Sequence, residues 1–460
     1  MGNKKNAWLK FDNTKKEEIF SFCEGYKKYI SDCKTERESI KEAIYLAESK
    51  GYRDLKNVIS AGKSLKAGDK VYYNNMDKSL ALFLIGSESI ESGMRIIGSH
   101  VDSPRLDLKP NPLYEDSELS LMETHYYGGV KKYQWVTIPL ALHGVVVKKD
   151  GTKIDVVVGE EETDPVVMVS DLLVHLASEQ QQKKATEVIA GEDLNILVGS
   201  MPLVGEEKEA VKANILKLLK EKYDFEEEDF MSAEIEIVPA GKARDLGLDR
   251  SMVAGYGHDD RICAYTSLLA LLETESTKKT SVVLLVDKEE VGSIGATGMQ
   301  SRFFENAVAE LMDRVGEYSE LKLRRALANS KMLSSDVTAA FDPNYAGAYE
   351  KKNSAFFGKG LAFAKYTGAR GKSGCNDANA EFVAWLRNVM DENDVAYQMA
   401  ELGKVDQGGG GTIAYILAEY GMEVIDCGVA LQNMHAPWEV ASKVDIFETM
   451  RGYKAFLMAE

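Results

Sequence analysis

Histidines and carboxylates that could bind a metal follow short apolar segments of this sequence. His100 and Asp102 come directly after the apolar residues of RIIGSHVDS. Residues two apart in an extended chain point to the same side. A metal-binding histidine is held in one tautomer by an acceptor on its far nitrogen, and a carboxylate two residues on can supply that acceptor. Taken alone, His-x-Asp is more often structural than metal-binding, so the motif depends on support from elsewhere.

A pair of acids stands at the start of an expected helix in GHDDRIC. Asp259 or Asp260 could bridge two cations, since backbone N–H donors and the helix dipole favour a carboxylate at this position. Helix capping by an aspartate explains the pair equally well. These residues alone therefore leave open whether the pair binds metal or caps the helix. They also do not show which of the two acids would bridge the cations.

Two adjacent glutamates follow the apolar run SVVLLV in DKEEVGSIGATG. Buried carboxylates are costly unless a cation or a proton accompanies them. Because adjacent side chains diverge, one of Glu289 and Glu290 could bind a metal while the other moves protons at the substrate. A surface salt-bridged pair is the alternative, but the apolar strand before it favours the functional interpretation.

Two further candidates are Asp336 in LSSDVTAAFDPNY and His435 in LQNMHAPWE. Alone, each is explained by a helix cap or by a structural histidine. Together with the motifs above they provide the nitrogen and oxygen ligands that zinc accepts. With two ions about 3.5–4 Å apart, a bridging aspartate offsets their repulsion and a shared water becomes a nucleophile near neutral pH.

The elements that must position these residues alternate between strands and helices after about residue 243. Helices are expected at RICAYTSLLALLET, NDANAEFVAWLRNVMDEN and GGGTIAYILAEYG, and strands at SVVLLV and MEVIDCGVAL. This alternation predicts an α/β fold in which helices sandwich a mixed, largely parallel sheet. Ligands bind at the carboxyl ends of the strands in such folds, which is where the candidate residues stand.

The segment from about residue 110 to 242 has a different, β-rich pattern. ALHGVVVKKDGTKIDVVVG predicts a hairpin that turns at Asp150-Gly151, and SAEIEIVPA predicts a strand with one solvent-facing side. Val211, Ile215, Leu218 and Leu219 would form one apolar face of a helix between them. We therefore predict a core of residues 1–109 and 243–460, interrupted by a second domain of residues 110–242.

Composition excludes several classes of partner. The 73 acidic and 56 basic residues give a formal charge of −17, which disfavours nucleic acid and anionic membranes. The five cysteines are scattered and lack CxxC spacing, as expected for reduced thiols in a cytosolic protein. No apolar run resembles a signal peptide or reaches the roughly eighteen residues of a membrane span. We therefore expect a cytoplasmic protein.

The ordered motifs SHVDSPRLDLKP, GHDDRICA, DKEEVGS, SSDVTAAFDPNY and NMHAP resemble the aspartyl aminopeptidase family of dinuclear zinc metallopeptidases, peptidase family eighteen of the metallo class. The resemblance spans nearly the whole chain. It implies that Asp259 bridges two zinc ions, Glu289 is the catalytic base and Asp102 orients one histidine. The implied zinc ligands are His100, Asp259, Glu290, Asp336 and His435. A one-residue shift that makes Asp260 the bridging acid remains open.

The same resemblance implies a zinc-exopeptidase-like core that hydrolyses N-terminal residues from peptides through a water bridged by two zinc ions, with cobalt or manganese able to replace zinc. It also implies that residues 110–242 form an oligomerisation or lid domain and that the chain assembles into a homo-oligomer, commonly a dodecamer. Two alternatives are a related zinc amidohydrolase or dipeptidase, and a non-catalytic metal-binding scaffold. The spare carboxylate of Glu289 beside Glu290 argues against a scaffold.

The preference for particular N-terminal residues of the substrate is the property that the sequence determines least. Lys365, in GKGLAFAKYTG, stands where the resemblance places a substrate-binding lysine, although a solvated surface lysine is an equal alternative. Acid-selective family members tend to carry a histidine after the residue that matches Asp336, and VTAAFDPNY has none. We therefore predict a broad aminopeptidase with at most a moderate acidic preference, to which Lys365 contributes.

Overall fold

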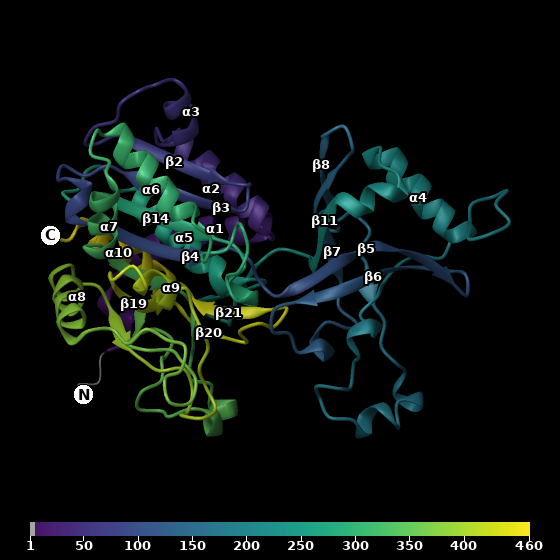
Figure 1. Ribbon diagram of the computed structural model, residues 1–460. Helices are drawn as coiled ribbons and strands as arrows, with labels where there is room; N and C mark the ends of the chain where they lie inside the picture. The colour runs from purple at the N-terminus through teal and green to yellow at the C-terminus, as the bar shows by residue number, and fades with distance from the viewer. Residues whose placement is uncertain (1–4) are drawn as a thin grey trace. The chain divides into compact units, whose positions relative to one another are not determined.

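The computed structural model describes residues 5–460, which fall into two compact units (Figure 1). The first unit contains the chain up to Asp102, Ala243–Met434 and Glu439–Glu460. The second contains Ser103–Lys242 and the short segment His435–Trp438. The chain thus leaves the first unit directly after Asp102 and returns to it at Ala243.

A nine-stranded sheet is the centre of the first unit. Its order is β1-β2-β3-β14-β4-β15-β19-β17-β18. The four strands β14, β4, β15 and β19 run parallel, and antiparallel pairs flank them, so the sheet is mixed with a parallel centre. The bounds are β1 Arg53–Asp54, β2 Lys70–Asn75, β3 Ser79–Leu84, β4 Arg95–His100, β14 Ser281–Val286, β15 Lys331–Ser335, β17 Leu361–Ala364, β18 Tyr397–Met399 and β19 Glu423–Gly428.

Helices cover both faces of this sheet (Figure 1). Their bounds are α1 Asn13–Asp32, α2 Glu36–Ser49, α3 Leu55–Ser60, α5 His258–Leu272, α6 Phe303–Arg314, α7 Glu320–Ala328, α8 Ala380–Glu392, α9 Ala414–Ala418 and α10 Lys443–Met458. Alternate residues of each central strand enter opposite cores. Ile97 of β4, for example, packs with α5 and α10, whereas Ile96 packs with α6 and α7. Burial on both faces explains why these strands are continuously apolar.

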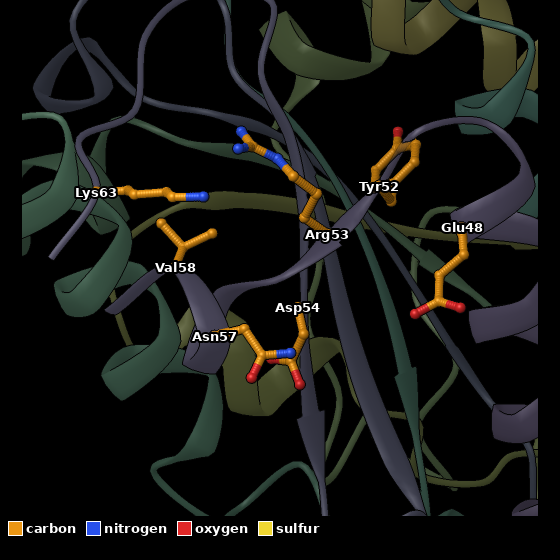
Figure 2. Close-up of a pocket in the computed structure, with 7 residues that line it drawn as sticks. All are labelled: Glu48, Tyr52, Arg53, Asp54, Asn57, Val58 and Lys63. Carbon is orange, nitrogen blue, oxygen red and sulfur yellow. The ribbon is translucent and has the colours of Figure 1, made fainter. Parts of the chain in front are cut away.

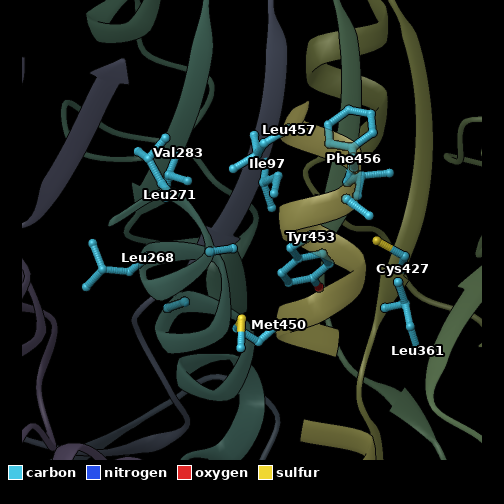
Figure 3. Close-up of a cluster of buried hydrophobic side chains, with 14 of the residues drawn as sticks. Ile97, Leu268, Leu271, Val283, Leu361, Cys427, Met450, Tyr453, Phe456 and Leu457 are labelled. Carbon is cyan, nitrogen blue, oxygen red and sulfur yellow. The ribbon is translucent and has the colours of Figure 1, made fainter. Parts of the chain in front are cut away.

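Figure 3 shows the core on the α5 and α10 face. Ile97 and Val283 of the sheet belong to one buried cluster with Leu268 of α5 and with Tyr453 and Phe456 of α10. These two helices therefore rest on the strands that carry the candidate residues. The packing fixes the start of α5, where Asp259 and Asp260 stand.

A second sheet of the first unit has the order β12-β13-β21-β20-β16. Its strands are β12 Arg244–Leu246, β13 Met252–Gly255, β16 Thr338–Ala339, β20 Ala430–Gln432 and β21 Glu439–Ser442. β13 leads into α5, and β21 leads into α10. This small sheet therefore connects the starts of the two helices that cover the main sheet.

The second unit is built on an antiparallel seven-stranded sheet in the order β8-β7-β11-β5-β6-β10-β9. Its elements are β5 Arg105–Asp116, β6 Leu119–Tyr127, β7 Leu140–Val147, β8 Lys153–Val158, β9 Met168–Val169, β10 Ile196–Gly199, β11 Ala233–Pro239 and α4 Ala210–Tyr223. The hairpin predicted at Asp150-Gly151 is present between β7 and β8. β5 already belongs to this sheet, which is why the unit begins earlier than residue 110.

Two local expectations for this unit hold only in part. β11 faces solvent only at its start: Glu234 is exposed, but Glu236 is buried, with its Oε2 3.3 Å from Nε of Arg105, and this ion pair makes burial of the acid tolerable. The helix α4 buries Val211 fully, but Leu218 is 50% exposed, so its apolar face is narrower than predicted. Alternation of residue types cannot reveal a buried ion pair.

In the first unit, the helix predicted for residues 409–421 is also shorter than expected. Only Ala414–Ala418 is helical, because the glycines before it lose too much conformational entropy to extend the helix.

Among the helices of residues 5–460, none combines the length and apolarity that crossing a membrane requires.

Candidate metal centre

The parallel centre of the main sheet brings three motifs to one edge. β4 lies between β14 and β15, and His100 is its last residue. Asp336 comes immediately after β15, and Glu289 and Glu290 begin the short helix η8 (Glu289–Val291) after β14. Because the three strands run in the same direction, their carboxyl ends coincide. The first unit therefore assembles a histidine and several carboxylates from distant parts of the sequence.

The ring of His100 faces three of these carboxylates. Its Nε2 lies 3.2 Å from Oδ1 of Asp259, 3.7 Å from Oε2 of Glu289 and 3.8 Å from Oδ1 of Asp336. The histidine is 2% exposed, and within residues 5–460 no hydrogen bond satisfies this nitrogen. A buried ring nitrogen surrounded by oxygen atoms without a hydrogen bond is an arrangement suited to a cation.

Asp102 contacts both His100 and the turn that carries the glutamates. The Nδ1 of His100 lies 2.9 Å from the backbone oxygen of Asp102 and 3.3 Å from its Oδ1. The backbone N–H of Glu289 donates to Oδ1 of Asp102 at 3.2 Å, and that of Glu290 donates to Oδ2 at 3.1 Å. This geometry suits the orienting role expected for Asp102. It also gives the residue a second task, because one carboxylate positions both glutamates.

The two acids at the start of α5 face different atoms of His100. Asp259 approaches the ring Nε2, whereas Oδ2 of Asp260 accepts the backbone N–H of His100 at 3.3 Å. The peptide bond between them is cis. The carboxylate of Asp259 faces the ring of His100, whereas that of Asp260 faces the backbone of β4.

Burial dominates the electrostatics of this cluster. It raises the pKa of Asp260 well above the usual range, and burial together with nearby Asp260 does the same for Asp336. For His100, burial lowers the pKa, but the carboxylates of Asp102 and Asp259 outweigh it and raise the pKa well above the usual value. The cluster thus favours added positive charge.

The donor atoms lie close enough to share an ion. One atom from each of His100, Asp260 and Asp336 lies within 4.8 Å of the others, as does one from each of His100, Glu289 and Glu290. Imidazole and carboxylate donors suit zinc, and cobalt or manganese accept the same set. The residues present therefore fit a bound zinc ion.

Two further predicted residues also make contacts away from the ends of the parallel strands. His435 belongs to the second unit, where its Nδ1 lies 2.9 Å from the backbone oxygen of Gly129. Lys365 follows β17, and its Nζ lies 3.6 Å from Oδ1 of Asp377. Both side chains of this pair are nearly half exposed, and no contact recorded within residues 5–460 joins Lys365 to the carboxylate cluster.

A surface pocket of about 370 Å³ lies among residues of α2, β1 and α3, and it contains none of the predicted site residues (Figure 2). Glu48, Arg53, Asp54 and Lys63 give it charges of both signs. Several are already engaged within the protein, since Arg53 pairs with Asp69 at 3.1 Å and Asp54 caps α3.

The structure adds two residues that sequence reasoning missed. Oε2 of Glu439, at the start of β21, accepts the backbone N–H of Asp259 at 3.0 Å, and this glutamate is 1% exposed. Gly428 ends β19, and a Cβ atom there would lie 2.1 Å from the backbone oxygen of Asp336. A glutamate at the start of the apolar stretch EVAS was the available signal for the first, but the second depends on strand register.

Comparison with known proteins identifies the chain. The family model described as aminopeptidase I zinc metalloprotease (M18) matches residues 29–457. The donor set and this match define a zinc metalloprotease. The chain belongs to the M18 family of aminopeptidases, which confirms the resemblance and the enzyme class and sets aside the scaffold and the other amide hydrolases.

Relatives and solved structures agree with this assignment. A probable M18 family aminopeptidase 1 of Clostridium acetobutylicum is 66% identical over 454 residues, covering 98% of each chain. A protein of the same description from Borrelia garinii subsp. bavariensis is 46% identical, covering 98% of this chain and 99% of its own. Crystal structures of aminopeptidase I from C. acetobutylicum (TM-score 0.93, 65% identity) and of an M18 aminopeptidase from Thermotoga maritima (0.94, 45%) each match over 99% of both chains.

Gly428→Ala tests how tightly β19 supports Asp336. The added methyl group must displace backbone, which typically costs about 1–3 kcal/mol of stability and would shift the carboxylate of Asp336. We expect a lower melting temperature and reduced aminopeptidase activity. Gly347→Ala is the matched control, because its Cβ would meet nothing within 4 Å. Equal activity and equal melting temperature in the two variants would contradict this role of Gly428.

Proposed function

We propose that this M18 aminopeptidase uses two zinc ions, held by His100, Asp259, Glu290, Asp336 and His435, with Asp259 between them. The observation that carries the proposal is the Nε2 of His100, which is buried without a hydrogen bond and faces carboxylates of Asp259, Glu289 and Asp336. Zinc bound there would polarise the peptide carbonyl and lower the pKa of the attacking water.

The hydrogen bonds at the two histidines support their assignment as ligands. The Nδ1–H of His100 donates to the backbone oxygen of Asp102, and the Nδ1–H of His435 donates to that of Gly129. In each ring this tautomer leaves the lone pair of Nε2 for a metal. Between the two acids of α5 we choose Asp259, because Asp260 is engaged by the backbone of His100.

Glu289 is the proposed base. Its side chain is 15% exposed, so a substrate can reach it, and Asp102 fixes its backbone. The Glu289 carboxylate would take a proton from the attacking water and return it to the leaving amine. The adjacent Glu290, whose backbone is held by the same aspartate, would remain a metal ligand. One turn thus provides both functions.

Glu289→Gln and Glu290→Gln separate the base from the ligand. We expect Glu289→Gln to keep its zinc content but to lower kcat on a leucyl anilide by about 10²- to 10⁴-fold, since proton transfer is lost. Glu290→Gln should lose bound zinc as well as activity. Zinc content is measured by metal analysis, and an N-acetylated anilide, which no variant should cleave, is the substrate control. A Glu289→Gln enzyme with near wild-type kcat would refute the assignment.

A moderate preference for acidic N-terminal residues is part of the proposal and depends on the sequence resemblance at Lys365. Such a preference needs a cation to pair with the substrate carboxylate as it leaves water. The Nζ of Lys365 already faces a carboxylate oxygen, that of Asp377 at 3.6 Å, and both side chains remain accessible. A substrate carboxylate would compete with Asp377 for this cation.

Lys365→Met should therefore lower kcat/KM for an aspartyl substrate by about tenfold and leave a leucyl substrate nearly unchanged, since only the former loses a charge partner. Lys322→Met is the control, because Lys322 on α7 is similarly exposed at 43%. Equal effects on both substrates, or none, would remove Lys365 from substrate binding.

We also propose a cytoplasmic homo-oligomer that associates through the second unit, an inserted oligomerisation or lid domain. A solved structure described as a dodecamer, from Saccharomyces cerevisiae, has the same fold at 20% identity and a TM-score of 0.77. The second unit exposes Leu172, Leu173, Val174 and Leu176 by 48–68%. Consecutive exposed apolar residues favour a protein interface. The cytoplasmic location is supported by the five cysteines, which are all free thiols.

Light scattering tests the assembly. The 50.9 kDa chain should form a defined oligomer, and Leu173→Glu combined with Leu176→Glu should yield smaller species, because two charges would be buried without partners. Leu218→Glu, at a half-exposed position of α4, should leave the mass unchanged. A monomeric wild-type chain would contradict the assembly.

A further inference from the structure

The backbone of Asp259 is held by a buried acid from another part of the first unit. Glu439 is the first residue of β21, lies opposite Gly255 of β13 and is 1% exposed. Its Oε2 accepts the backbone N–H of Asp259 at 3.0 Å. We propose that Glu439 is a positioning residue that holds Asp259 in its metal-binding orientation. The inference depends on the proposed function, because it matters only if Asp259 binds zinc.

The N–H of Asp259 needs an acceptor because of the local backbone. Asp259 stands in the first turn of α5, where N–H groups have no partner within the helix. Its ψ of 109° is also non-helical, and Gly257 before it has a φ of 72°. The peptide unit is therefore not fixed by helical hydrogen bonding. A contact from outside the helix must set the direction in which the Asp259 carboxylate points.

The residues on either side of Asp259 are braced by other groups. The ring of His258 contacts the hydroxyl of Tyr26 and, at 3.2 Å, the backbone oxygen of Val253. The buried guanidinium of Arg261 donates to backbone oxygens, including that of Gly257 at 3.1 Å. These contacts stabilise the turn, but they do not involve the N–H of Asp259. Glu439 accepts that N–H and so holds a part of the turn that the other contacts do not fix.

Stability alone does not explain a glutamate at position 439, because burying its carboxylate costs desolvation free energy. A neutral oxygen could accept the same N–H, whereas a carboxylate must be desolvated close to the acids around His100. In return, a charged acceptor forms a hydrogen bond roughly twice as strong as a neutral one. Asp102 has the same arrangement toward Glu289 and Glu290. The cluster thus uses buried acids to hold the backbone of the acids that face the metal.

The expected consequence of losing this contact is weaker metal binding. Outer partners of metal ligands typically contribute 10- to 100-fold in affinity. We expect Glu439→Ala to bind zinc about 10- to 100-fold more weakly and Glu439→Asp, which keeps the charge but withdraws the oxygen, to be similarly impaired. Glu439→Gln keeps an acceptor oxygen at the same reach but loses its charge, so its zinc affinity should fall only slightly, to within about threefold of wild type.

The experiment is a zinc titration of the metal-stripped full-length chain against a chromophoric chelator, with melting temperatures recorded in excess chelator. Asp445→Ala is the control, since buried Asp445 likewise accepts backbone N–H groups, from Gly358 and Gly360 at 2.7 Å, away from the cluster. It should lower the metal-free melting temperature and leave zinc affinity unchanged. Glu439→Ala and Glu439→Asp should show the reverse pattern.

The outcomes separate the two claims. Wild type that binds two zinc ions while Asp259→Asn loses them supports the proposed function, and the Glu439 variants then decide the inference. Zinc affinities of Glu439→Ala and Glu439→Asp equal to wild type overturn the inference alone. If Glu439→Ala does not fold, the contrast between Glu439→Gln and Glu439→Asp decides it. A wild-type chain that binds no zinc overturns both claims.

Discussion

The carboxylate of Asp102 is the contact on which the arrangement of the site depends. It accepts the backbone N–H groups of Glu289 and Glu290 and lies beside Nδ1 of His100. One side chain thus joins the end of β4 to the turn after β14. The parallel sheet brings these segments together, but it does not fix the rotation of the turn. Asp102 does so, and it directs both glutamates toward the ring nitrogen of His100.

The arrangement around His100 would be unfavourable without positive charge. Its Nε2 is buried among carboxylate oxygens, and burial raises the pKa of Asp260 and of Asp336. Acids placed this closely oppose their own ionisation. A divalent cation removes that conflict and converts the cluster from a strained set of acids into a coordinated one. The charge balance of the cluster therefore favours a bound divalent cation.

Much of the site could be predicted because its residues stand at the ends of recognisable elements. His100 ends one apolar strand, Asp336 follows another, and Glu289 and Glu290 come after SVVLLV, so parallel packing alone brings them together. The parallel centre of the sheet was predictable for the same reason. Asp259 and Asp260 could not be separated in this way, because the choice depends on backbone geometry at the start of α5.

Other features depend on contacts that sequence patterns do not encode. Glu439 meets Asp259 only because β21 pairs with β13 in one particular register. Glu236 resembles a solvent-facing residue of an alternating strand, yet Arg105 neutralises it inside the second unit. Gly428 is required by the backbone of Asp336, which comes immediately after the neighbouring strand β15. In each case, the residue that makes the contact is distant in sequence. The sequence pattern around either residue therefore does not predict the contact.

Diffraction measured at the zinc absorption edge from crystals of the zinc-loaded protein tests the two-zinc centre most directly. The centre predicts two anomalous peaks per chain, about 3.5–4 Å apart, with Asp259 between them. His100 and Asp336 should bind one ion, and Glu290 and His435 the other. A single peak per chain, or peaks that lie away from Asp259, would contradict it.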